Sequence, residues 1–114
     1  MTRLLEDLRD LPGAELVLPG LADLAAGRDT VEALLVEIAA PRLRRLGLDV
    51  PPRDDLEPER RLYLRLHAER PEGVHARYNA LIRRLIAFSQ ALEGRVSRAR
   101  RRGRSELGRP TDAP

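Results

Sequence analysis

Apolar residues recur every three or four positions along most of this chain, and this spacing limits its possible folds more than any other feature. Between residues 31 and 40 the pattern places four large apolar residues on one face: Val31, Leu34, Leu35 and Ile38. Such spacing is typical of an amphipathic α-helix. Leu, Ala, Glu and Arg favour helices, and the β-branched runs that favour strands are missing. The sequence therefore predicts an all-α fold.

Glycine and proline divide this pattern into segments. Pro19 and Pro41 either kink a helix or start a new one, and the proline-rich stretch 48–58 is a connector. The longest helix, about 74–93, carries a stripe of large apolar residues beside a stripe of alanines, which indicates neighbours on two sides. We expect a small bundle of about four to six helices with this long helix at its centre. Helix ends are expected at glycines: Gly13, Gly27, Gly47 and Gly94.

Length and charge set the domain organisation. A chain of 114 residues, 42% of them apolar, can bury one modest core, so we expect a single helical domain over 1–94. Residues 95–114 carry seven arginines and two acids, net +5, whereas residues 1–94 carry 14 arginines and 16 acids, net −2. The 95–114 segment has too few apolar residues to order itself, which predicts a disordered Arg-rich tail.

Several functional classes are disfavoured by what the sequence lacks. Without cysteine there is no disulfide, cysteine nucleophile or cysteine metal site. No apolar run approaches the ~20 residues that span a bilayer, and no signal-peptide core is present, so we expect a cytoplasmic protein that does not contact membranes. The two histidines, His67 and His75, lie in no catalytic or metal-ligand spacing. We expect no catalytic residue, no cofactor and no metal.

Two arginines of the longest expected helix fall within its apolar surface. At 100° per residue, Arg77 and Arg84 lie between the large apolar stripe and the alanine stripe. An unpaired buried guanidinium is costly. Each arginine must therefore extend to solvent or pair with an acid such as Glu32, Glu37 or Asp23, or else receive an anion or a partner's carboxylate. Because the flanking surface is flat and apolar, the second alternative is a protein interface.

The helix expected at about 58–70 has a second unusual face. Arg61 and Arg65 lie one turn apart with like charge, and Leu64 also points away from the expected core. This face is either a solvated charged surface or a partner-binding surface. With the pair on the longest helix, it favours a non-enzymatic protein-interaction module that forms a homodimer through the last two helices. Such a dimer should weaken on Arg84→Glu or Leu85→Arg.

The Arg-rich segment supports an alternative function, nucleic-acid binding. Arginines that neutralise phosphates release counterions, which gives salt-dependent affinity for DNA or RNA without sequence selectivity. No aromatic residue is interleaved with them, so base stacking is not expected. The same arginines could instead form a solvated tail or contact the acidic domain. The arm would consist of six residues: Arg95, Arg98, Arg100, Arg101, Arg102 and Arg104.

A third alternative rests on Arg61 and His67, which are separated by five residues. This spacing is similar to the Arg-x4-6-His motif of the HEPN family of small all-helical ribonucleases. The resemblance implies that both residues would meet their copies across a dimer and attack RNA through its 2′-hydroxyl. Leu62 departs from the family pattern, in which a polar residue usually follows the arginine. We place this alternative last.

Overall fold

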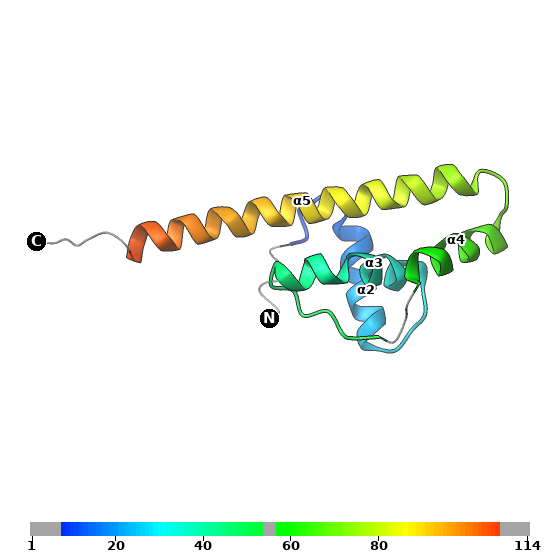
Figure 1. Cartoon of the computed structure of the whole chain (residues 1–114), viewed down its shortest axis with the longest axis horizontal. Coiled ribbons are helices and arrows are strands. Elements are labelled where there is room, and N and C mark those ends of the chain that lie inside the picture. The colour runs from blue at the N-terminus through cyan, green and yellow to red at the C-terminus, as the bar shows by residue number, and fades with distance from the viewer. Residues whose placement is uncertain (1–7, 54–56, 108–114) are drawn as a thin grey trace, which may run out of the picture.

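The computed structural model describes residues 8–53 and 57–107, and within these ranges it is helical and contains no strand (Figure 1). This confirms the all-α prediction and the long C-terminal helix. The first expected helix begins outside the described residues, and residues 8–13 form turns that lead into the bundle. No helix in the described part is long and apolar enough to cross a membrane. The helices are α2 (Ala14–Ala25), α3 (Val31–Arg45), α4 (Pro58–Glu69) and α5 (Val74–Leu107).

Helix α3 is the most enclosed element of the bundle. It contacts α2, α4 and α5, and Leu34, Leu35 and Val36 are each at most 1% exposed. Thr30 begins the helix in an extended conformation, and its hydroxyl accepts a hydrogen bond from the Ala33 N–H at 3.0 Å. The helix continues through Pro41, and α2 likewise continues through Pro19, so neither proline ends a helix.

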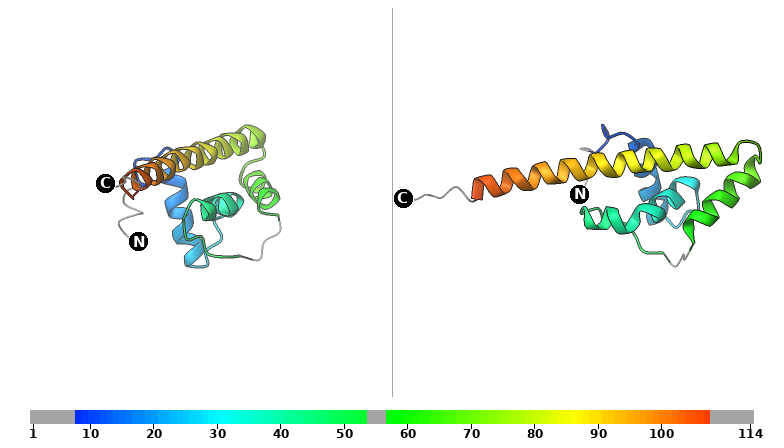
Figure 2. Two further views of the ribbon diagram at one scale, coloured as in Figure 1. Left: turned by 60° about the vertical axis from the view of Figure 1, so that its left-hand side comes forward. Right: turned by 45° about the horizontal axis from the view of Figure 1, so that its top comes forward.

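Helix α5 packs against the bundle with one face only. Its large apolar stripe is buried, with Leu85, Phe88 and Leu92 at most 3% exposed, whereas Ala76 and Ala80 are exposed. The prediction that neighbours cover both stripes was therefore wrong at Ala76 and Ala80, near the start of α5. Helix α5 lies along one side of the bundle, and α3 takes the enclosed position (Figure 2).

Gly94 does not end α5, contrary to the prediction. The helix continues to Leu107, and Gly94 is not among the glycines with positive φ. By contrast, Gly27 and Gly47 follow α2 and α3 with φ of 75° and 101°, as expected for glycine helix ends. A helical glycine costs about 1 kcal/mol relative to alanine, which good helix formers on both sides can offset. We call residues 95–107 the α5 extension.

The prediction of a disordered tail over residues 95–114 is not confirmed. Residues 95–107 are helical, and the remaining residues, 108–114, lie outside the described part of the structure. Val96 packs against the apolar core, so the start of the extension is fixed to the bundle. Beyond this point the helix projects past the end of the bundle (Figures 1 and 2).

The packing of α2 on α3 depends on Gly20. A Cβ atom at this position would lie 2.5 Å from the Val36 Cγ2 atom and would also collide with the carbonyl oxygen of Glu32. A hydrogen in place of a side chain allows the two backbones to approach this closely. A Cβ atom at Gly94 would meet only the Arg98 Nη1 atom, at an ordinary 3.5 Å.

The same substitution should therefore have opposite effects at these two helical glycines. Gly20→Ala should lower the free energy of unfolding by about 1–3 kcal/mol, because the new methyl group overpacks the α2–α3 contact. Gly94→Ala should raise it by up to about 1 kcal/mol, because alanine is the better helix former. Urea unfolding followed by circular dichroism measures both changes. A loss of stability on Gly94→Ala would contradict a helix that continues past this residue.

Candidate nucleic-acid interface

Two arginine-rich segments that are far apart in the sequence meet at one end of the bundle. The last turn of α3 lies beside α5 at the start of the α5 extension (Figure 1). Between them is a groove of about 250 Å³, which carries three arginines against one glutamate. Its lining residues are Arg42, Arg45, Leu46, Glu93, Val96, Ser97 and Arg100. We call this groove, together with the exposed arginines of the α5 extension, the basic end.

Local sequence explains how α3 presents its arginines. Leu43 is fully buried, so the arginines next to it in the sequence project away from the core. Arg44 donates hydrogen bonds to the Val50 carbonyl at 3.0 and 3.1 Å and fixes the loop that follows the helix. Arg42 and Arg45 line the groove, and Arg42 pairs with Glu93 of α5. Cations in the last turn of a helix are also favoured by the helix dipole.

The predicted arm residues fall into two groups. Arg95 forms two hydrogen bonds to the Asp10 carboxylate, at 3.1 and 3.2 Å, and so anchors the start of the α5 extension. Four others are exposed and form no hydrogen bond or ion pair with the rest of the described chain: Arg98, Arg100, Arg101 and Arg102. Arg104 belongs to the same helix, and its side chain lies outside the described part of the structure.

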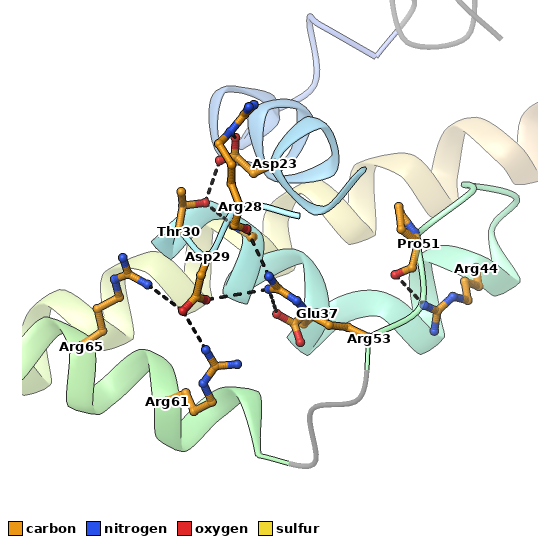
Figure 3. A network of polar contacts seen from close by, with 11 residues as sticks. Asp23, Arg28, Asp29, Thr30, Glu37, Arg44, Pro51, Arg53, Arg61 and Arg65 are labelled. Atoms are coloured by element: carbon orange, nitrogen blue, oxygen red, sulfur yellow. Dashed lines mark hydrogen bonds and ion pairs between the residues drawn. The ribbon is translucent and has the colours of Figure 1, made fainter. Parts of the chain in front are cut away.

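The arginines of α4 are held within the molecule. Arg61 and Arg65 approach one oxygen of Asp29, at 2.9 and 3.4 Å (Figure 3). Arg53 lies 3.8 Å from the other oxygen of Asp29 and 2.7 Å from the buried carboxylate of Glu37. These contacts tie α4 to the loop that precedes α3, and they tie the connector to α3 itself. The two guanidiniums are therefore paired within the molecule, and their side chains keep 41% and 38% of their surface exposed.

Leu64 does point away from the core, as predicted, and its side chain is 54% exposed. It borders a shallow depression of about 290 Å³, whose other lining residues are Asp29, Leu34, Arg61 and Arg65. The sequence-predicted face of α4 thus keeps one exposed apolar residue, flanked by arginines that are already paired.

Arg77 and Arg84 also have partners inside the molecule. Arg77 donates to the carbonyl oxygens of Leu66, at 3.1 Å, and Arg70, and thereby caps the end of α4. Its Nε atom is buried and has no hydrogen-bond partner among the described residues. Arg84 pairs with Glu15 of α2. Two of the acids suggested by the sequence have other partners: Asp23 accepts from Arg28 and Thr30, and Glu37 pairs with Arg53.

The histidines are not placed as a catalytic pair. His67 is exposed and lies about 120° around α4 from Arg61, whose guanidinium contacts Asp29. The Nδ1 atom of His75 lies 3.1 Å from the Tyr63 hydroxyl. In the described part of the chain, no three histidine or acidic side chains are grouped to hold a metal ion.

Sequence reasoning missed Arg42 and Arg45 as candidate site residues. The stretch 42–45 contains three arginines, and this local charge is a signal that was available. These arginines belong to a candidate site only because the last turn of α3 lies beside the α5 extension. That contact requires α5 to continue past Gly94.

The pKa of Asp10 provides a test of the anchor at the start of the α5 extension. Hydrogen bonds from Arg95 hold this pKa below its ordinary value of about 3.9. The stability that the contact contributes is present above pH 4 and is lost as the pH falls through the lowered pKa. Carbon NMR titration of the Asp10 carboxyl should show a depressed pKa in the wild type. Arg95→Gln should return it toward 3.9, and an unchanged pKa would show that Arg95 is not its cause.

Comparisons with known proteins add no further assignment. No protein family, no curated protein and no solved structure matches this chain. The interpretation of the basic end therefore rests on its own residues, charges and geometry, and on these grounds it is the candidate functional site of the protein.

Proposed function

We propose that this protein binds nucleic acid through phosphate contacts made by the basic end. The observation that carries the proposal is the meeting of the last turn of α3 with the α5 extension, where exposed arginines have no carboxylate partner among the described residues. Arg45, Arg98 and Arg100 to Arg102 are all exposed. Because each phosphate contact releases counterions, a cluster of this size supports useful affinity.

The distribution of ion pairs distinguishes this region from an ordinary solvated surface. Carboxylates hold several of the described arginines of the bundle, among them Arg28, Arg42, Arg53, Arg61, Arg65 and Arg84. The α5 extension contains six arginines and one acid, Glu106, and one of these arginines, Arg95, is paired with Asp10. Most of the positive charge of the α5 extension is therefore available to an external polyanion.

Salt dependence of binding tests this proposal. Wild-type protein should bind fluorescent DNA or RNA with an affinity that falls steeply as salt rises. Arg98→Gln with Arg101→Gln should make the slope of log K against log salt less negative by up to about 2, since each lost phosphate contact removes about 0.9 on B-DNA. Fluorescence anisotropy at several salt concentrations measures the slope.

A double variant away from the basic end is the matched control. Arg60 and Arg83 are exposed and have no ion pair with the described residues, so Arg60→Gln with Arg83→Gln removes the same charge. This control should retain the wild-type slope. An equal change of slope in both double variants would show that net charge alone, and not the basic end, determines binding. Absence of binding by the wild type would refute the proposal.

A homodimer formed through α4 is the second candidate function. It is favoured by one observation, the 54% exposure of Leu64 beside a depression lined in part by Leu34. A second copy of the same helix could cover the exposed side chain of Leu64 across a two-fold axis. Leu85 is unsuitable as a probe of this interface, because it is only 3% exposed and belongs to the core.

Leu64→Arg should convert such a dimer to a monomer, because it places a charge at the centre of the contact. Ile86→Arg is the control, since Ile86 is 44% exposed on α5 and lies outside the depression. Light scattering over a concentration series measures the mass of each variant. A wild-type monomer at all accessible concentrations would eliminate this candidate.

A further inference from the structure

We infer that the nucleic acid is duplex DNA and that the α5 extension lies in its major groove. This inference rests on the proposed function and specifies the partner. It draws on four features of the basic end: the shape of the extension, the arrangement of its arginines, the position of Arg45 beside it, and the absence of aromatic residues from its surface.

The shape of the α5 extension fits the major groove. A single α-helix with its side chains is about 10–12 Å across, and the major groove of B-DNA is about 12 Å wide. The part of the extension beyond its contacts with the bundle, residues 98–107, is about 15 Å long at 1.5 Å per residue. No other helix covers the part that projects past the bundle (Figure 2). The major groove of A-form RNA is too deep and narrow to admit such a helix.

The arginines of the extension are not confined to one narrow stripe. At 100° per residue, the described side chains span an arc of about 200° around the helix axis. They are Arg98, Arg100, Arg101 and Arg102, all exposed. A helix in a groove has phosphates on both sides, so a broad arc of cations can pair with both strands. A flat anionic surface would contact only part of this arc.

The end of α3 supplies a contact beside the extension. Arg45 and Arg100 line the same groove of the protein. Arg45 is exposed and forms no hydrogen bond or ion pair with the described residues. When the extension enters the major groove, Arg45 approaches the phosphates at its edge. Because α3 is enclosed by the bundle, this second contact fixes how the bundle is oriented on the duplex.

The basic end lacks the features that would favour single strands. The chain has three aromatic residues, and none belongs to the α5 extension. Phe88 is fully buried, and Tyr63 packs edge-on against Tyr78 where α4 meets the first turns of α5. Proteins that prefer single strands stack bases on exposed aromatic side chains, and the described basic end has none.

Competition among matched nucleic acids tests the inference. The full chain is titrated at near-physiological salt with a 20-base-pair DNA duplex, the RNA duplex of the same sequence, and one DNA strand alone. Binding to the DNA duplex should be at least about tenfold tighter than to either alternative. Methyl green, which occupies the major groove, should displace the protein, and netropsin, which occupies the minor groove, should not.

A helix-breaking variant separates the shape of the extension from its charge. Ala99 is exposed, so Ala99→Pro retains every arginine and disrupts the extension while leaving the bundle folded, which thermal unfolding verifies. It should lose the preference for duplex DNA and keep the affinity for a single strand. Ala99→Ser, which preserves the helix, should behave as the wild type.

The possible outcomes distinguish the two proposals. Equal binding to all three nucleic acids, displacement by netropsin, or a retained duplex preference in Ala99→Pro would overturn the major-groove inference and leave the proposed function standing. Absence of binding to any nucleic acid would overturn both.

Discussion

The burial of α3 is the constraint on which the rest of the structure depends. Residues 34–36 have almost no exposed surface, so neighbouring helices enclose α3 at this level. Its start is fixed by the Thr30 cap, and its end by the hydrogen bonds from Arg44 to the Val50 carbonyl. An element held in this way presents the side chains of its last turn at a defined place. The arginines that border the groove of the basic end owe their position to this enclosure.

Pairing of arginines with carboxylates gives the molecule two electrostatic regions. Around α3 and α4, Asp29 and Glu37 hold three arginines in a network that joins the connector to both helices (Figure 3). Surface pairs of this kind contribute little stability individually, but they remove free positive charge from the bundle. The α5 extension has no comparable supply of acids. The separation of paired from unpaired arginines underlies both proposals for nucleic-acid binding.

Apolar periodicity predicted the all-α fold and the amphipathic helix that corresponds to α3, because both follow from spacing within a single helix. The prediction of a helix end was wrong at Gly94, where the preference of glycine for helix ends competes with the helix preference of its neighbours. Gly94 is a common type of helix end, yet helix formers on both sides and the packing of Val96 continue α5 through it. The exposure of Ala76 and Ala80 was also missed, since small apolar residues are compatible with either environment. The partner of Arg77 was not predictable, because it is a backbone carbonyl, and every residue carries one whatever its type.

The sequence by itself determined that the chain is helical, that its apolar residues are almost all aliphatic, and that positive charge is concentrated after Gly94. Only the tertiary structure decided which arginines are neutralised. The deciding pairs join Arg42 to Glu93, Arg84 to Glu15 and Arg95 to Asp10, across 51, 69 and 85 residues of chain. An ion pair requires two side chains within a few ångströms, and for residues so far apart that distance is set by how the helices pack. Among the described residues, this packing leaves Arg45, Arg98 and Arg100 to Arg102 without a carboxylate partner.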